Sequence, residues 1–190
     1  VFLAITPVVG KKILKNLKFK KNKIIISFIS TIKMKELRQL INTDAIIVRA
    51  IPLPPISLMK GPIPLFPRNK KVKFFFNKLG NSLEIDNEKL SLNFWAISSL
   101  MASYYEMLYQ SSKWLEKKGL NKIESQEYIT SLFSALSDNA VLNSKKDLKI
   151  LIKNSQTPNG LNEQTLKYLK KSGFYKEFIN SLNTILNKLK

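Results

Sequence analysis

The segment Thr157–Glu163 (TPNGLNE) combines residue types that could hold a small anionic molecule. Thr157 can cap a helix, Pro158 suits a first helical turn, and Gly160 lets the backbone come close to a ligand. The N-terminus of the helix that follows would present N–H groups that suit a carboxylate or a phosphate. The same pattern fits a plain connection between two helices, so both interpretations stay open.

Two further candidate segments follow apolar runs that are typical of buried strands. Thr6–Val8 follows the run Val1–Ile5, and Pro52–Pro55 follows the run Ala45–Ile51. In an open parallel sheet, ligands bind outside the carboxyl ends of the strands, where both segments would lie. The prolines favour a shaped rim at that edge, although they could equally stiffen two ordinary loops.

The chain of 190 residues contains no Cys and no His, which restricts its chemistry. A disulfide framework, a thiolate metal site, a cysteine nucleophile, a Ser–His–Asp triad and the usual zinc sites are excluded. The usual general base near neutral pH is absent as well. The acidic residues are scattered, with neither a paired-carboxylate spacing nor a metal-ligand cluster, so no metal site is predicted.

A formal net charge of +19 is typical of proteins that bind nucleic acid or an anionic membrane. Only Arg38, Arg49 and Arg68 are arginines, however, whereas phosphate and base recognition favours the arginine fork. The lysines are spread over the whole chain among many Asn and Ile residues, which is typical of a coding bias toward A/T-rich codons. We therefore expect neither a nucleic acid nor a membrane as partner.

The chain shows no membrane-spanning or targeting segment. Its longest apolar run, Ile24–Ile29, is far shorter than the roughly 20 residues that a membrane span needs. Residues 1–9 have no basic leader and no cleavage site, so no signal peptide is predicted and the expected location is cytoplasmic. The chain begins with Val1 inside a predicted strand rather than with Met, so we expect its natural N-terminus to lie upstream.

Predicted strands and helices alternate in the first part of the chain. Strands are expected at 1–5, 23–30, 45–51 and 82–85, and helices at 8–17, 33–41 and 68–79. This order is the signature of right-handed parallel crossovers. The proline-rich stretch Pro52–Pro67 fits neither a helix nor a central strand and is predicted as a loop. An α/β domain over residues 1–86 is therefore expected.

The second part, residues 87–190, is expected to be all helical. Its predicted helices cover 87–118, 125–136 with Ser125 as N-cap, 145–153, 161–171 and 174–189. An amphipathic helix as long as the first of these needs the other helices or a second subunit to bury its apolar stripe. Its aromatic residues are therefore assigned to a core or an interface: Phe94, Trp95, Tyr104, Tyr105 and Trp114.

Together these segments resemble the pyrroline-5-carboxylate reductase family over essentially the whole chain. The resemblance is carried, in the family's order and spacing, by Val1–Pro7 (VFLAITP), Ile47–Pro55 (IVRAIPLPP), Thr157–Asn162 (TPNGLN) and the closing stretch Phe174–Leu189. It implies a fold that is α/β followed by all-α. The C-terminal half of a Rossmann-type parallel sheet domain would occupy 1–86, and a helical dimerisation and substrate domain would occupy 87–190.

Members of this family are NAD(P)H-dependent oxidoreductases that reduce the cyclic imine 1-pyrroline-5-carboxylate to L-proline in amino-acid biosynthesis. By resemblance, the nicotinamide end of NADPH or NADH would contact Thr6, Pro7, Ala50, Ile51, Pro52, Leu53 and Pro54. The substrate would contact Thr157, Pro158, Asn159, Gly160, Leu161, Ser98, Ser99 and Ser103, with Asn162 as the catalytic residue. The resemblance also implies a homodimer through the C-terminal helices, or a larger homo-oligomer.

Several departures from the family pattern carry predictions of their own. The glycine-rich turn that binds the pyrophosphate is missing and would lie upstream of Val1, so we expect a fragment that binds dinucleotide poorly alone. Leu53 replaces an Asn, which removes a polar contact to the cofactor. The family's glycines and proline are absent from Ser98–Tyr104, which is predicted as regular helix with Met101 filling the space. Asn162 replaces a substrate-facing Thr and can still hydrogen-bond an imine nitrogen.

Three alternatives remain beside the pyrroline reductase. The first is a divergent paralogue that acts on another imine or a keto acid. The second is a non-catalytic dimeric helical protein that has lost the cofactor half, and the third is a basic nucleic-acid-binding module. Cofactor binding by the complete protein separates the reductases from the second alternative, and a steep loss of affinity with salt would identify the third.

Overall fold

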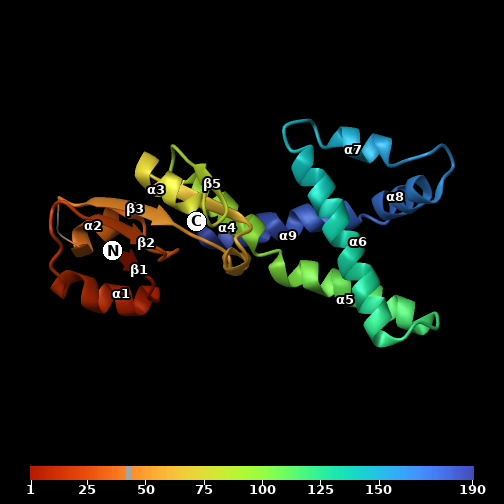
Figure 1. Ribbon diagram of the computed structural model, residues 1–190, viewed down its shortest axis with the longest axis horizontal. Coiled ribbons are helices and arrows are strands. Elements are labelled where there is room, and N and C mark those ends of the chain that lie inside the picture. The colour runs from red at the N-terminus through yellow and green to blue at the C-terminus, as the bar shows by residue number, and fades with distance from the viewer. Residues whose placement is uncertain (42–43) are drawn as a thin grey trace. The chain divides into compact units, whose positions relative to one another are not determined.

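The computed structural model describes residues 1–41 and 44–190, which form two compact units (Figure 1). Unit 1 comprises Val1–Trp95, and unit 2 comprises Ala96–Lys190. The boundary predicted near Asp86 therefore lies inside unit 1. Residues 87–95 belong to unit 1 and contact it: the ring of Trp95, for example, packs against the buried side chain of Arg49.

Unit 1 is built on a five-stranded sheet in the order β1-β2-β3-β4-β5. The strands are β1 (Phe2–Leu3), β2 (Ile24–Ser27), β3 (Ile46–Ala50), β4 (Pro62–Phe66) and β5 (Asn81–Glu84). The first three strands are parallel, with Phe2 opposite Ile26 and Ser27 opposite Arg49. β4 is antiparallel to β3 and parallel to β5. The predicted α/β class and the parallel pairing of the first three strands are confirmed.

Helices cover both faces of this sheet. Unit 1 contains α1 (Pro7–Ile13), the 3-10 helix η1 (Leu14–Asn16), α2 (Met34–Ile41), α3 (Lys70–Phe76) and most of α4 (Leu90–Ser98). Ile25 belongs to the apolar cluster that contains Leu37 of α2, whereas its neighbour Ile26 belongs to the cluster that contains Phe76 of α3. Since successive strand residues point to opposite faces, α2 and α3 lie on opposite faces. Burying one large apolar side chain of these two clusters stabilises the fold by about 1.5–3 kcal/mol. Unit 1 therefore has a hydrophobic core of its own.

The prediction that Pro52–Pro67 contains neither a helix nor a central strand is wrong. The stretch forms the 3-10 helix η2 (Pro54–Leu58) and then β4, which lies between β3 and β5. Prolines occupy the start of η2, where a helix needs no N–H donor. Met59 ends η2 in the left-handed region, with a φ of 54°.

β4 accommodates Pro62 and Pro64 because the backbone at these two residues is directed away from β5, so β5 needs no N–H donor from them. The carbonyls of Gly61 and Leu65 accept hydrogen bonds from the β5 side at 2.9 and 3.0 Å, so alternate residues from 61 to 65 face that strand. The two prolines face the side of β3, whose pairing with β4 ends at Ala50 opposite Leu65. Their missing donors therefore fall beyond the last pair of that ladder, so a central strand tolerates both prolines.

Unit 2 consists of helices. After the end of α4 follow α5 (Met101–Lys117), α6 (Lys122–Leu142), α7 (Lys149–Asn154), α8 (Leu161–Lys171) and α9 (Phe174–Leu189). The bounds predicted for the last two helices are those of α8 and α9, and Gly173 between them has a φ of 81°. α7 begins at Lys149, later than the predicted start at Lys145. The helical character predicted for the second part of the chain is confirmed.

α5 and α6 pack against each other and are joined by a short turn. Ser112 on α5, and Ser125 and Ile129 on α6, are the buried residues of these two helices. The turn between the helices contains Gly119 with a φ of 108°. Asn121 caps α6, since its side chain accepts a backbone N–H at 2.9 Å. The prediction of Ser125 as N-cap is therefore wrong, because an earlier capping side chain starts the helix.

The long helix predicted over 87–118 is divided between α4 and α5. The N–H groups of Ser99 and Leu100 bond to carbonyls three residues back, at 3.3 and 3.2 Å, as in a 3-10 turn. The Ser99 hydroxyl also donates to the carbonyl of Ala96 at 2.7 Å. A serine that bonds its own turn competes with the regular helical ladder. The prediction of unbroken helix over Ser98–Tyr104 is therefore wrong.

Candidate functional site

The carboxyl ends of β1, β2 and β3 meet at one edge of the sheet in unit 1. Leu3 lies opposite Ser27, and Ser27 lies opposite Arg49, so the three strands end at the same level. The segments that follow β1 and β3 therefore leave the sheet from the same edge. This geometry brings Thr6–Pro7 and Ala50–Pro54, the residues that the resemblance assigns to the cofactor, to one edge of one sheet. We call it the carboxyl edge.

At this edge Thr6 is exposed and forms the N-cap of α1. Its Oγ1 accepts a hydrogen bond from the backbone N–H of Val9 at 3.5 Å. Pro7 follows in the first helical position, where no N–H is required. A Cβ on Gly10 would lie 3.1 Å from the side chain of Ile29, so a glycine lets α1 pack closely on the segment after β2. The position of Thr6 is thus fixed by the packing of α1.

The loop after β3 is held in shape by its own hydrogen bonds. Ala50 is buried, Leu53 is half-buried and Pro54 is exposed. The carbonyl of Leu53 accepts the N–H of Ile56 at 2.9 Å, and the hydroxyl of Ser57 donates to the carbonyl of Pro54 at 3.1 Å. The loop therefore offers backbone groups and apolar surface rather than charged side chains.

A buried arginine lies at the carboxyl edge, and the sequence analysis did not assign it to a site. Arg49, near the end of β3, is only 3% exposed. Its guanidinium forms an ion pair with Glu88, donates to the carbonyl of Ser30 and lies 5.0 Å from the centroid of the Trp95 ring. Glu88 also accepts the backbone N–H of Met34 at 2.6 Å. We call these five residues the Arg49 cluster.

Burial lowers the pKa of Arg49 from its ordinary value, whereas the carboxylate of Glu88 raises it. An arginine is effectively always protonated in proteins, so the cluster contains a permanent buried cation. One signal in the sequence pointed to this arrangement. An arginine inside the apolar run Ala45–Ile51 must find partners if the strand is buried.

In unit 2 the candidate binding segment forms a tight turn before α8. The N–H of Gly160 donates to the carbonyl of Thr157 at 2.8 Å, and Asn159 has a φ of 61°. A Cβ on Gly160 would lie 2.2 Å from Thr157 Oγ1 and 3.0 Å from the Thr157 carbonyl oxygen, so any larger residue would force Thr157 to move. Glu163 accepts the N–H of Asn159 at 2.6 Å and binds Lys167 at 2.7 Å. The Lys167 ammonium and the N–H of Asn159 hold the pKa of the Glu163 carboxyl below its ordinary value.

The predicted bounds of α8 are correct, but its capping differs from the expectation. The helix begins at Leu161, and Gly160 is its N-cap without any side-chain capping bond. Thr157 is therefore not the cap, and Pro158 lies outside the first helical turn. The cause is the tight turn itself, in which Glu163 reaches back to a backbone N–H before the helix. That N–H is engaged within the chain, so fewer backbone donors face a ligand than the sequence suggested.

Asn162, which the resemblance assigns to catalysis, lies exposed in the first turn of α8. Its Nδ2 donates to the carbonyl of Ser155 at 2.7 Å. An amide side chain has two N–H donors and one acceptor oxygen, so this bond uses only part of its capacity. The neighbouring Leu161 is 81% exposed. The turn therefore presents one oriented amide beside an apolar side chain.

The three serines of the expected substrate site lie around the break between α4 and α5. Ser98 is the last residue of α4, Ser99 bonds within the break, and Ser103 is exposed on α5. Ser103 lines a groove of unit 2, whose lining does not include the segment Thr157–Asn162. This groove therefore contains one part of the expected substrate site, Ser103, but not the other part, Thr157–Asn162.

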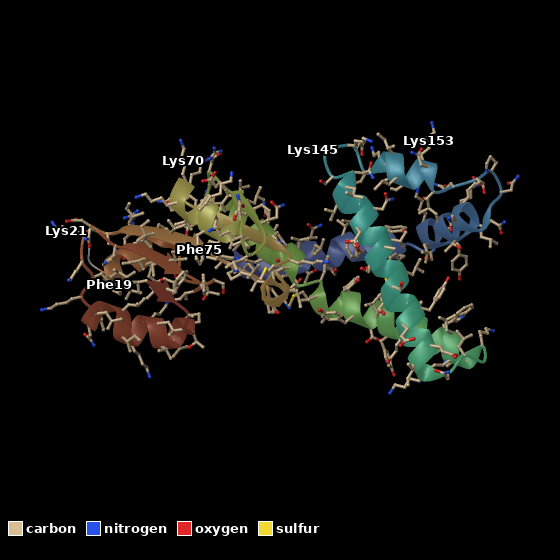
Figure 2. The ribbon with its side chains drawn as sticks, viewed as in Figure 1. Phe19, Lys21, Lys70, Phe75, Lys145 and Lys153 are labelled. Atoms are coloured by element: carbon tan, nitrogen blue, oxygen red, sulfur yellow. The ribbon has the colours of Figure 1, made fainter. Side chains whose placement is uncertain are left out.

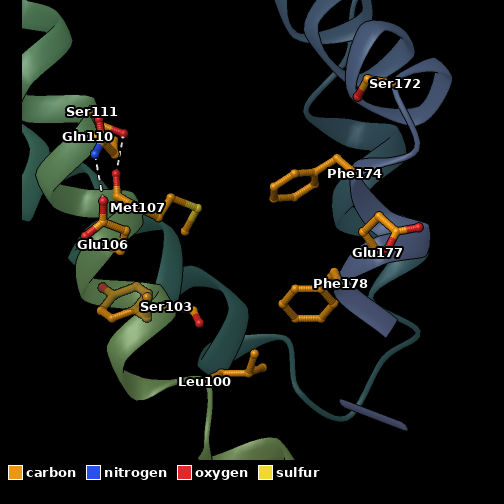
Figure 3. Close-up of a pocket in the computed structure, with 11 residues that line it drawn as sticks. Leu100, Ser103, Glu106, Met107, Gln110, Ser111, Ser172, Phe174, Glu177 and Phe178 are labelled. Carbon is orange, nitrogen blue, oxygen red and sulfur yellow. Dashed lines mark hydrogen bonds between the residues drawn. The ribbon is translucent and has the colours of Figure 1, made fainter. Parts of the chain in front are cut away.

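This groove lies between α5 and the start of α9 and has a cavity volume of about 950 Å³ (Figure 3). Leu100, Tyr104 and Met107 line one side, and Phe174 and Phe178 line the other. Its lining is mostly apolar, which suits an apolar partner better than a charged substrate. The aromatic stripe of the sequence analysis predicted an apolar surface on the α5 side of the groove. The other side was not predicted, although the spacing of Phe174 and Phe178, four residues apart on the last helix, could have indicated it.

Basic side chains are spread over different elements of both units, as the labelled lysines show (Figure 2). Lys70 is the first residue of α3, Lys145 precedes α7 and Lys153 lies within α7. Lys21 precedes β2 and binds Asp44 at 2.8 Å, which raises the pKa of Lys21. This distribution does not favour one continuous basic face for nucleic acid.

Residues 1–41 and 44–190 contain neither a candidate membrane span nor a candidate metal-ion cluster. In this part of the chain no helix is long and apolar enough to cross a membrane. Nor do three or more His, Cys, Asp or Glu side chains come together there as a metal ion would require. The candidate site is therefore described by the carboxyl edge of unit 1 and by the turn and groove of unit 2.

Comparison with solved structures identifies the same fold in three reductases. A 1-pyrroline-5-carboxylate reductase from Streptococcus pyogenes is 22% identical, with a TM-score of 0.82, over all of this chain and 75% of its own. A pyrroline-5-carboxylate reductase from Coxiella burnetii is 21% identical, with a TM-score of 0.84, over all of this chain and 74% of its own. A Plasmodium falciparum pyrroline carboxylate reductase with NADP bound is 23% identical, with a TM-score of 0.83, over all of this chain and 75% of its own.

Sequence comparison adds no closer relationship, since no family model and no curated protein matches the chain. The fold likeness nevertheless extends through both units, from the parallel strands to the last helix. It agrees with the resemblance that the strand-end segments, the turn before α8 and the closing helix indicated. The chain therefore has the fold of the pyrroline-5-carboxylate reductases over its full length.

Proposed function

We propose that the chain is part of an NAD(P)H-dependent reductase that acts on the C=N bond of a cyclic imine, with 1-pyrroline-5-carboxylate as substrate and L-proline as product. The observation that carries this proposal is the full-length fold match to three pyrroline-5-carboxylate reductases, one of them with NADP bound. Such chemistry requires neither His nor Cys, because the cofactor supplies the reactive hydride. A chain without either residue is compatible with it.

In this proposal the nicotinamide end of the dinucleotide binds at the carboxyl edge of unit 1. Ligands of open parallel sheets bind at this edge, and here exposed Thr6 and the loop Ala50–Pro54 shape it. In this proposal Thr6, Pro7 and that loop hold the nicotinamide of NADPH or NADH. The six glycines of the chain include no Gly-x-Gly-x-x-Gly spacing, so these residues would hold only that end of the cofactor.

The turn before α8 is the proposed substrate-binding element. Asn162 would hydrogen-bond the imine nitrogen, because its bond to Ser155 orients the amide and leaves an acceptor and a donor for a ligand. Glu163 supports this role by holding the turn on its other side. The residues proposed to contact the carboxylate and ring are Ser98, Ser99, Ser103 and Thr157–Leu161.

The proposal includes a homodimer, or a larger homo-oligomer, formed through the helices of unit 2. Support comes from the apolar groove between α5 and α9 and from large apolar side chains that are exposed on these helices, such as Tyr105 and Ile179. A cytoplasmic role in proline biosynthesis completes the proposal.

The test is an assay of NADPH and NADH oxidation by the complete protein with 1-pyrroline-5-carboxylate. Asn162→Ala should lower kcat/KM by about tenfold or more, as expected when a polar positioning group is lost. Asn143→Ala is the matched control, since the amide of Asn143 also donates to a backbone carbonyl, that of Asn139, at 2.9 Å. Equal rates for Asn162→Ala and the parent protein would remove the catalytic role.

A second candidate function is a non-catalytic helical dimer, which the apolar groove and the exposed apolar side chains of unit 2 favour. Such a dimer would need no dinucleotide at all. Titration with NADPH separates the two functions before any turnover is measured. A complete protein that neither binds nor oxidises NADPH or NADH would contradict the reductase and support the non-catalytic dimer.

A further inference from the structure

Among the residues that the structure describes, Arg49 is the only charged residue that is buried. Taking a charge out of water is costly, and apolar residues of similar size are often no less stabilising at such a position. The Nε of Arg49 and the Nε1 of Trp95 are also buried without a hydrogen-bond partner, which adds to that cost. Stability alone therefore does not explain an arginine here.

The contacts of Arg49 connect the carboxyl ends of two strands with two helices of unit 1. Ser30 belongs to the segment after β2, and Trp95 lies on α4. Glu88 precedes α4 and also binds the N–H of Met34 at the start of α2. The planar guanidinium makes these contacts together because its N–H groups form a fixed fork. A lysine ammonium at the same place could satisfy one of these partners but not the whole set.

We propose that Arg49 is the positioning residue of the carboxyl edge: it fixes the ends of β2 and β3 so that the loop Ala50–Pro54 has the shape that receives the nicotinamide. This inference rests on the proposed function, which assigns the ligand of that loop. Arg49 is 3% exposed and acts through its neighbours. The loop begins at the residue that follows Arg49, so a shift of the guanidinium displaces the start of the loop.

Trp95 reports on this arrangement without any assay of activity. Its ring lies 5.0 Å from the guanidinium carbon of Arg49, whereas the only other tryptophan, Trp114, is 60% exposed in unit 2. In a Trp114→Phe background, fluorescence therefore comes from Trp95 alone. Arg49→Lys should increase acrylamide quenching of Trp95 by about twofold or more, because the lysine cannot hold Glu88 and the ring together.

Arg68→Lys is the matched control for this experiment. Arg68 also pairs with a carboxylate in unit 1, that of Asp86, but both side chains are exposed. Exposed pairs contribute little to stability, so Arg68→Lys should leave Trp95 quenching unchanged. The cofactor readout is the affinity of the complete protein for NADPH by titration calorimetry. Arg49→Lys should weaken binding between about tenfold and a hundredfold, and Arg68→Lys should not.

Unchanged Trp95 quenching in a folded Arg49→Lys protein would overturn the positioning role, whatever the protein binds. Altered quenching with unchanged NADPH affinity would overturn the link to the cofactor loop. A parent protein that binds no NADPH would overturn the proposed function and that link together, while the quenching still decides the role of Arg49 in the fold. If Arg49→Lys does not fold, Glu88→Gln replaces it, since it removes the charge and keeps an acceptor for Met34. Quenching and affinity like those of the parent protein would then contradict the proposal.

Discussion

The two units of the molecule bury apolar surface in different ways. In unit 1 the sheet has an apolar cluster on each face, and Ile25, Ile47 and Phe76 are almost fully buried. In the described part of unit 2 the buried residues are Ala96, Ser112, Ser125 and Ile129. Large apolar side chains stay exposed on each of its long helices. Unit 1 can therefore be stable on its own contacts, whereas the helices of unit 2 require further apolar cover.

The same contrast separates the two halves of the candidate site. At the carboxyl edge, Arg49 depends on Glu88, which is 39 residues away in the chain. In the turn before α8, Glu163 and Asn162 bind groups only four and seven residues away. The edge therefore needs the whole of unit 1, while the turn is encoded in a short local segment.

The largest expected effect tests the difference in burial. Phe76→Ala in unit 1 should lower the free energy of unfolding by about 3–5 kcal/mol, because it empties a fully buried site. Phe178→Ala in unit 2 should lower that of the monomer by about 1 kcal/mol or less, because Phe178 is 39% exposed. Urea denaturation at low protein concentration measures both. Equal losses would mean that unit 2 has a core as complete as that of unit 1.

The next effect tests whether a second copy supplies the missing cover. Met107→Lys places a charge in the groove between α5 and α9 and should weaken self-association about a hundredfold, or nearly 3 kcal/mol. Tyr168→Lys is the control, since Tyr168 is 73% exposed on α8 and does not line the groove. Sedimentation velocity over a range of concentrations gives the association constants. A Met107→Lys protein that associates like the parent would show that this groove is not the interface.

The smallest effect concerns the local turn and its dependence on pH. The folded pKa of Glu163 is lowered, so its bonds stabilise the turn above the ordinary glutamate pKa of about 4.3 and are lost as pH falls through the lower folded value. The amide proton resonance of Asn159 should therefore shift in acid, and Glu163→Gln should abolish the shift. The amide of Val72, which bonds to the neutral side chain of Asn69, should not follow this titration. An Asn159 resonance that is constant with pH would contradict the bond.

The sequence predicted those helices, strands and turns that are determined by residues close together in the chain. α8 and α9 begin after Gly160 and Gly173, and the amphipathic pattern that follows each glycine fixes the helix. The three parallel strands were visible as continuous apolar runs, since both faces of the sheet are covered. The turn before α8 was recognised for the same reason, although its capping was assigned to the wrong residue, Thr157.

The missed features depend on partners that are distant in the chain or on bonding alternatives. β4 could be recognised only once the register placed Pro62 and Pro64 beyond the last pair with β3. The break at Ser99 arises because a hydroxyl and a helical ladder compete for the same carbonyl. The Arg49 cluster could not be predicted without the fold, because Glu88 is 39 residues from Arg49 and comes near β3 only once β4, α3 and β5 are in place.

The prolines of β4 have a consequence for the behaviour of the protein in concentrated solution. Beyond the last pair with β3, this stretch of strand edge carries carbonyl groups at Pro62 and Pro64 but no N–H donors. A strand from another molecule that approached this edge could form only half of a ladder. The two prolines therefore protect the sheet against edge-to-edge aggregation at the place where β3 stops short of its neighbour.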